Sequence, residues 1–203
     1  AGCGVEYQDK FGNITILGLS DEEIKFLKKA PAKMKDLLKM KIQSILPKLT
    51  ELKCNKLLDV AICDTRFTPT INLNEILDLA GNNISLTLRL QNMMKEIMDE
   101  IIDYTKGTDL ENSFYLHIMP NLGKRDNKEI MKMATKQQRG TTDIQFIING
   151  ALKEAGLLVL LNYFIKNKSG FYPFGKDFNI RNAPKGREEL INLCIEKISP
   201  NDM

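Results

Sequence analysis

The sequence contains no tryptophan and a single histidine, His117, and its four cysteines are dispersed along the chain. The cysteines form no C-x-x-C pair, which argues against a zinc finger or ribbon, because such sites use closely spaced cysteine and histidine ligands. Dispersed cysteines permit disulfides, but a chain of 203 residues can bury a core without them. We therefore expect reduced cysteines and a cytoplasmic protein, following the general rule on redox compartments.

Long apolar runs and glycine-rich phosphate loops are also missing. The longest apolar run, residues 156–165, contains Asn162 and is too short to span a bilayer. Gly150 and Gly156 match neither G-x-G-x-x-G nor the P-loop. We expect no cofactor and no metal. The net charge of +3 is too small to indicate a polyanionic partner, so only the distribution of charge can argue for one.

The clearest pattern that is present is one long helix between Ser85 and Gly107. Its apolar residues recur at steps of three and four for about five turns and form one stripe. Ser85 suits the N-cap and Gly107 the left-handed position after the helix. The far side carries an acidic ribbon, formed by Glu96, Asp99, Glu100 and Asp103. The many lysines between residues 25 and 56 either lie on a solvated face or pair with this ribbon.

The rest of the chain alternates between helical and strand-like patterns. The expected elements are a β-hairpin over 5–19, a helix from Ser20 that Pro31 and then Pro47 interrupt, a helix over 49–61, a short helix over 74–80, a strand over 113–119, helices over 126–138 and 143–155, and a closing helix over 186–199. Residues 64–72 are expected to be irregular. Residues 157–165 suit a strand or more helix, and Gly156 and the length of the run favour a strand.

These elements predict an α+β fold, a predominantly helical single domain with a long central amphipathic helix and a small β-sheet. One domain is the best estimate for this length. Within it we distinguish the hairpin (1–19), a helical part (20–110) and a mixed α/β part (111–203). The sheet is expected to combine the hairpin, the strand over 113–119 and, if it forms, the strand over 157–165.

The segment 166–187 interleaves cations with aromatic rings, and glycines and prolines keep it out of regular structure. Cations that follow phosphates and rings that stack on bases are what single-stranded nucleic acid requires. A second basic cluster lies upstream, where lysines four residues apart would share one face of the predicted helix over 126–138. The candidate nucleic-acid-binding residues are Lys128, Lys132, Lys136, Arg139, Lys166, Lys168, Phe171, Tyr172, Phe174, Lys176, Arg181, Lys185 and Arg187.

The aromatic residues of this loop have a second interpretation. Phe171, Phe174 and Phe178 would then pin a long loop to the core, and the lysines would simply be solvated. The function we predict first is nonetheless nucleic-acid binding, to single strands or RNA. No catalytic residue is assigned, and the sequence leans against an enzyme.

Two further hypotheses remain open. The alternative is a structural or assembly protein that forms oligomers through the helix over 85–106, because methionine-rich stripes suit adaptable interfaces. The third is an enzyme that uses His117, which shares a strand face with Tyr115 and Met119, or a metal bound by carboxylates. Cys63 would be a thiolate near Arg66 in one interpretation, but its apolar surroundings favour a small buried residue.

Overall fold

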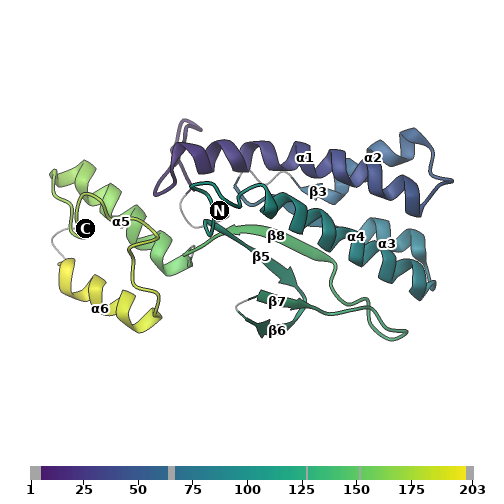
Figure 1. Ribbon diagram of the computed structural model, residues 1–203. Helices are drawn as coiled ribbons and strands as arrows, with labels where there is room; N and C mark the ends of the chain where they lie inside the picture. Colours follow the sequence, from purple (N-terminus) through teal and green to yellow (C-terminus); the bar gives the residue numbers. More distant parts are fainter. Residues whose placement is uncertain (1–5, 64–66, 127, 151, 200–203) are drawn as a thin grey trace. The chain divides into compact units, whose positions relative to one another are not determined.

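The computed structural model describes residues 6–63, 67–126, 128–150 and 152–199 (Figure 1). The chain divides into two compact units, which we call the terminal unit (Ala1–Asp21 with Ile148–Met203) and the central unit (Glu22–Ile147). Each is described by itself. Helices dominate the described residues and short strands form small sheets, which confirms the predicted α+β class. The single-domain organisation stays a prediction.

The helices of the central unit follow the predicted apolar patterns closely. They are α1 (Asp21–Ile45), α2 (Glu51–Ala61), α3 (Asn74–Ala80) and α4 (Ile84–Asp103). The predicted interruption at Pro31 is wrong, because α1 continues through it. Pro31 is buried, and Leu27 and Met34 on either side of it lie in the core. Packing of one continuous apolar stripe therefore outweighs the hydrogen bond that a proline removes from a helix interior.

The long helix α4 is capped by Asn83 rather than by the predicted Ser85. The Asn83 side chain accepts a hydrogen bond from the Leu86 amide at 3.0 Å. Gly107, beyond the end of the helix, has the predicted positive φ of 67°. The methionines and isoleucines of the apolar stripe are buried within the central unit, from Met93 to Ile101. The stripe is thus already covered, which removes the basis for self-association through this helix.

Lysines neutralise most of the acidic ribbon on α4. Lys41 of α1 donates to Glu96 at 3.1 Å, which confirms that a lysine of the first helices pairs with the ribbon. Lys95 pairs with Asp99 within the helix, and Lys106 pairs with Asp103 at 2.6 Å. Such exposed pairs each contribute little to stability. Their effect is to remove the like-charge repulsion that the sequence pattern implies.

A four-stranded sheet lies against these helices (Figure 1). Its strands, in spatial order, are β3 (Ile62–Cys63), β4 (Thr70–Asn72), β8 (Asp143–Ile148) and β5 (Phe114–Met119). β4 pairs antiparallel with both β3 and β8. One face of the sheet is apolar and buried. There the ring of Phe146 packs against Phe114 at 5.0 Å and against Phe26 of α1 at 5.6 Å between ring centroids.

Two predicted helices of this region are wrong. Residues 126–138 form no helix: β6 (Asn121–Arg125) and β7 (Lys128–Met131) make an antiparallel hairpin, and a loop follows. Asp126 at the turn has a φ of 49°, a conformation that aspartate tolerates better than most residues. The predicted helix over 143–155 is also wrong, because its first half is β8. Ile144, Phe146 and Ile148 alternate with less buried neighbours, which is the period of a strand.

The terminal unit contains an antiparallel hairpin and two helices. Its elements are β1 (Glu6–Gln8), β2 (Ile14–Ile16), α5 (Lys153–Ser169) and α6 (Arg187–Lys197). The hairpin and the closing helix were predicted, but the hairpin forms its own two-stranded sheet. The predicted strand over 157–165 is wrong, since α5 spans it. Tyr7 of the hairpin packs edge-on against Phe164 of α5, with ring centroids 4.9 Å apart.

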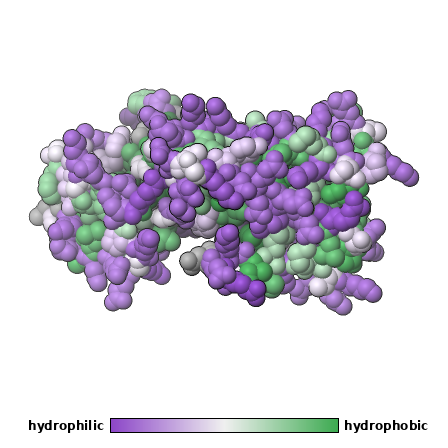
Figure 2. Space-filling model, viewed as in Figure 1, coloured by the Kyte–Doolittle hydropathy of each residue, from purple (hydrophilic) through white to green (hydrophobic). Residues whose placement is uncertain are grey.

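Most of the surface in view is hydrophilic, with scattered apolar residues (Figure 2). Within the described part of the chain, no helix has both the length and the apolar content that crossing a membrane requires. Cys54, Cys63 and Cys194 are free thiols, and Cys3 lies outside the described residues.

Candidate functional site

The sheet face opposite the apolar one carries polar side chains. Residues that face each other on neighbouring strands point to the same side, and the register pairs Cys63 with Thr70, Thr70 with Gln145, and Asn72 with Asp143. On the edge strand β5, His117 alternates with the buried Ile118, so its side chain belongs to the polar side. We call this the polar face, formed by Cys63, Thr70, Asn72, His117, Asp143 and Gln145.

A histidine–carboxylate pair lies at the edge of the polar face. His117 Nδ1 is 3.0 Å from Glu129 Oε1 and 3.1 Å from Glu129 Oε2. Glu129 lies on β7, in the hairpin that packs beside β5. The His117 side chain remains 35% exposed whereas that of Glu129 is 7% exposed. The carboxylate is therefore held inside while the imidazole reaches the surface.

Several donors fix the Glu129 carboxylate. Its Oε2 accepts hydrogen bonds from the Ile118 amide at 2.7 Å and from Asn121 Nδ2 at 3.0 Å. Burial alone would raise the pKa of Glu129, but the hydrogen bonds from Ile118 and His117, with the charges of His117 and Lys124, bring that pKa below its ordinary value. Glu129 is thus an ionised, immobilised carboxylate beside the only histidine of the sequence.

Asp143 is the second carboxyl group of the polar face. Asn72 Nδ2 donates to its Oδ2 at 3.2 Å. Its Oδ1 is buried and accepts no hydrogen bond from the described residues. Burial raises the pKa of Asp143, and the side chains of Asn72 and Gln145, with the charge of His117, only partly offset this. Asp143 and His117 therefore interact electrostatically across β8 and β5.

Cys63 does not have the surroundings of a reactive thiolate. It is half-buried, and burial, together with the neighbouring charge of Asp143, raises the pKa of its thiol. This supports the interpretation of Cys63 as a small packing residue. Arg66, which the thiolate interpretation requires, lies outside the described residues.

Replacement of Glu129 by glutamine is expected to destabilise the protein by about 1.5–3 kcal/mol near neutral pH, because hydrogen bonds to a charged group are lost. The folded-state pKa of Glu129 is lowered. Its stabilising effect is therefore present above the unfolded value of about 4.3 and is lost as pH falls through the folded value. Urea unfolding between about pH 6 and pH 3 should show the wild type and Glu129→Gln converging at the acid end.

Glu96→Gln is the matched control for this experiment, because it makes the same chemical change at an exposed carboxylate of the central unit. Its stability should follow that of the wild type at every pH. Parallel wild-type and Glu129→Gln curves, with no convergence in acid, would show that Glu129 is not held ionised by its partners.

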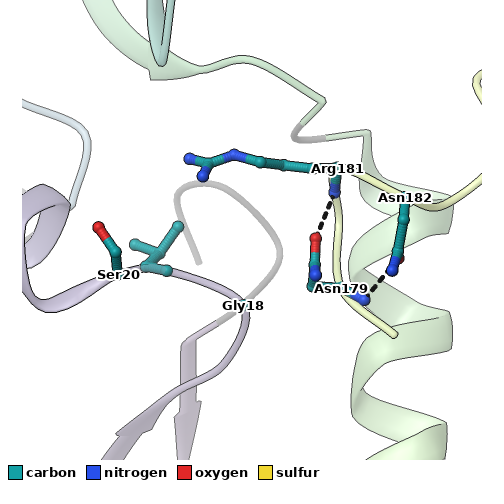
Figure 3. A pocket seen from close by; sticks show the side chains of 6 residues that line it. Gly18, Ser20, Asn179, Arg181 and Asn182 are labelled. Carbon is teal, nitrogen blue, oxygen red and sulfur yellow. Dashed lines mark hydrogen bonds between the residues drawn. The ribbon is translucent and has the colours of Figure 1, made fainter. Parts of the chain in front are cut away.

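A cavity of about 470 Å³ lies within the terminal unit (Figure 3). Its lining is Gly18, Leu19, Ser20, Asn179, Arg181 and Asn182. The Arg181 side chain extends across the cavity toward Ser20. The two asparagines are engaged by their own loop: Asn179 Oδ1 accepts from the Arg181 amide at 2.9 Å, and Asn182 Oδ1 accepts from the Asn179 amide at 2.8 Å. The side chains of Asn179 and Asn182 therefore stabilise the loop conformation. Because their Oδ1 atoms already accept these hydrogen bonds, they are less able to bind a ligand.

The upstream basic residues of the predicted nucleic-acid site do not form a helical face. Lys128 lies on β7, and Lys132 and Lys136 lie in the loop that follows, so their four-residue spacing is not the spacing of a helix face. Arg139 forms an ion pair with Asp78 of α3. These residues belong to the central unit. The basic–aromatic loop, by which we mean residues 166–187, belongs to the terminal unit.

The segment 166–187 comprises the last turn of α5, a loop and the first residue of α6, and its loop is largely a packing element. Phe174 and Phe178 pack against the terminal-unit core, with ring centroids 5.0 Å apart. The buried Asn162 of α5 binds the loop through the Phe174 amide at 3.0 Å and the Gly175 carbonyl at 2.9 Å. Of the predicted aromatics, Phe171 is exposed and Tyr172 is half-buried.

The cations of this loop lie mainly at the surface. Lys168, Lys176, Arg181, Lys185 and Arg187 are exposed and Lys166 is half-buried. Arg187 is 3.8 Å from Glu154 on α5. Exposure of lysine and arginine is ordinary for a protein surface and does not by itself indicate a nucleic-acid site.

Sequence reasoning found His117 and its face but missed Glu129, Asp143 and Asn72. Glu129 and Asp143 were assigned to the predicted helices over 126–138 and 143–155, and their actual partners lie on other strands. The alternation of Asp143, Gln145 and Ile147 with buried residues was the available signal for a strand. Among the described residues, no three or more histidine, cysteine, aspartate or glutamate side chains cluster as a metal site would require.

The family model and the curated relative that match this chain have the same description. The glucosylglycerol-phosphate phosphatase family matches the chain over residues 1–203. A glucosylglycerol-phosphate phosphatase from Synechocystis sp. is 33% identical over 201 residues, which cover 98% of this chain and 48% of the relative. The chain thus spans about half the length of that relative. No solved structure matches the chain.

These comparisons overturn the predicted function. A match to a phosphatase family over the whole chain contradicts nucleic-acid or RNA binding, and the assembly alternative has no support from it. The cation–aromatic pattern that motivated the prediction arises from rings that pack the terminal unit and from solvated lysines. The chain belongs to the glucosylglycerol-phosphate phosphatase family.

Proposed function

We propose that the protein is a phosphatase that hydrolyses the phosphate monoester of a small glycoside such as glucosylglycerol phosphate. The observation that carries this proposal is the family match over all 203 residues, together with a relative that bears this activity in its name. The whole activity belongs to the proposal, because the chain spans about half of that relative.

The polar face supports this function on chemical grounds. Hydrolysis of an alkyl phosphate expels a strongly basic alkoxide, so a positioned proton donor accelerates it. His117, Glu129 and Asp143 supply a histidine and two carboxyl groups, and the two carboxyls have pKa values displaced in opposite directions. Displaced pKa values of this kind are typical of sites that move protons.

The test is the release of inorganic phosphate from glucosylglycerol phosphate. Two polypeptides are compared, the 203-residue chain and the complete product of its gene, with a ribose phosphate and a nucleotide as competing esters. We expect saturable release from glucosylglycerol phosphate and a higher kcat/KM for it than for the other esters. Absence of phosphate release by both polypeptides, with a single-stranded RNA bound instead, would contradict the proposal.

The cytoplasmic location expected from the dispersed cysteines stays a prediction. The free thiols of Cys54, Cys63 and Cys194 are compatible with it. Fractionation of the source cells, followed by detection of the protein, would test it directly.

A further inference from the structure

We infer that His117 is the general acid of the phosphatase reaction, donating a proton from Nε2 to the departing alcohol, and that Glu129 is its positioning residue. This inference rests on the proposed function and names the group that carries out one step of it. It is drawn from the geometry of the histidine–carboxylate pair at the edge of the polar face.

The two nitrogens of the His117 ring have different surroundings. Nδ1 lies within 3.1 Å of both Glu129 oxygens, which fixes the orientation of the ring. Nε2 makes no hydrogen bond to any described residue. The side chain is 35% exposed, so this second nitrogen is able to meet a ligand. A histidine with one nitrogen fixed by a carboxylate and the other open is arranged for proton transfer.

Glu129 itself has little freedom to move. The Ile118 backbone amide and Asn121 Nδ2 both donate to its Oε2, and Asn121 Nδ2 also donates to the Ile118 carbonyl at 2.9 Å. β5 and β6 thus hold the carboxylate from two sides. The orientation of His117 is set by backbone structure and not by a mobile surface side chain.

Charged and titratable groups face His117 from the neighbouring strands. Glu129 on β7 contacts the ring, and Asp143 on β8 interacts with it electrostatically. The charge of Lys124 on β6 helps to lower the pKa of Glu129, and the charge of Asp143 helps to raise the pKa of Cys63 on β3. In the proposed step the ring donates as the imidazolium, with the ionised Glu129 carboxylate against Nδ1 as its counter-charge.

The step balances as follows. The oxygen of a water molecule forms a bond to phosphorus while the bond between phosphorus and the ester oxygen breaks. The electron pair of that bond goes to the ester oxygen, which takes the proton from His117 Nε2 and leaves as the neutral alcohol. The phosphate leaves as the dihydrogen anion, and one of its protons returns through solvent to His117.

The test compares two esters with different leaving groups in wild type and His117→Gln. Glycerol phosphate expels an alkoxide that needs a proton, whereas para-nitrophenyl phosphate expels a stable anion that does not. We expect His117→Gln to lower kcat/KM for glycerol phosphate by about 100- to 10,000-fold and for para-nitrophenyl phosphate by less than about tenfold.

The controls separate a catalytic effect from unfolding. Glu96→Gln should leave both rates unchanged, since Glu96 is an exposed residue of α4 paired with Lys41. Circular dichroism at each assay temperature establishes that His117→Gln is folded. Glu129→Gln should lower kcat/KM for glycerol phosphate by a larger factor than for para-nitrophenyl phosphate, because the His117 ring loses the contact that orients it. A purely structural role of Glu129 would lower both rates by the same factor.

The outcomes distinguish the two proposals. If the wild type cleaves neither ester, the proposed function fails and this inference fails with it. If the wild type cleaves both esters and His117→Gln slows both equally, or slows neither, the protein is a phosphatase but His117 is not its general acid.

Discussion

Replacement of Phe146 by alanine is expected to lower the free energy of unfolding of the central unit by about 3–5 kcal/mol. Phe146 is fully buried in the middle of β8. Its ring contacts Phe26 of α1 and Phe114 of β5, so it joins the helical layer to two strands of the sheet. Removal of the ring leaves a cavity between elements that cannot collapse together without shifting the strands that carry Asp143 and His117.

Urea unfolding followed by circular dichroism measures this loss, since the chain has no tryptophan to report by fluorescence. Phe171→Ala is the matched control, because Phe171 is 56% exposed, and it should cost no more than about 0.5 kcal/mol. Equal losses for the two variants would contradict the assignment of Phe146 to the core of the central unit.

Replacement of Gly140 by alanine is expected to cost about 3 kcal/mol or more, through strain and overpacking together. Gly140 has a φ of +70°, and a Cβ placed there would lie 2.2 Å from the Lys132 carbonyl oxygen and 2.7 Å from the Met133 carbonyl carbon. Both contacts are to backbone, which cannot rotate away. The loop between β7 and β8 would therefore have to open. This loop joins the strand that carries Glu129 to the strand that carries Asp143.

Gly107→Ala is the matched control, because it carries the backbone strain without the steric clash. Gly107 has a φ of +67° and nothing within 4 Å of the corresponding Cβ position, so alanine there meets only the backbone strain, about 1–2 kcal/mol. The difference between the two variants in thermal or urea unfolding measures the clash at Gly140. No difference between them would show that the loop at 132–140 is not closely packed.

The loop at Gly140 is also fixed by a buried glutamine. Gln91 of α4 is fully buried and donates to the carbonyls of Arg139 and Thr141 at 2.9 and 2.8 Å. Its Oε1 accepts from the Ala134 amide at 3.0 Å. A polar residue inside the apolar stripe of α4 is therefore explained by the loop that it binds. It completes the hydrogen bonds of backbone that would otherwise be buried without partners.

Elements with a long and regular pattern were predictable from the sequence. α3, α4 and the strand β5 were expected at nearly their observed positions, because their apolar residues repeat over the whole element and turn residues flank them. β8 was not, because Ile144, Ile147 and Ile148 have the i, i+3, i+4 spacing of a helix. α5 was not, because Gly156 and the short apolar run after it favoured a strand. Hydrogen bonds from β8 to β4 and β5 make residues 143–148 a strand, and these bonds join residues that are far apart in the sequence.

The candidate site was only half predictable for the same reason. His117 was placed on the correct strand face by alternation alone. Its partner Glu129 comes from the next hairpin, and Asp143 from a strand that pairs beside β5, so neither neighbour follows from spacing along the chain. The basic–aromatic loop was misleading because composition does not show which rings pack against the core, as the half-buried Phe174 and Phe178 do.

The location of the site on the polar face is tested most directly by nuclear magnetic resonance on the isotope-labelled protein titrated with glycerol phosphate. The account predicts chemical-shift changes at the amides of His117, Ile118 and Asp143 and at the His117 ring, on β5 and β8. Shift changes confined to the cavity of the terminal unit, at Asn179, Arg181 and Asn182, would contradict it and move the site to that unit.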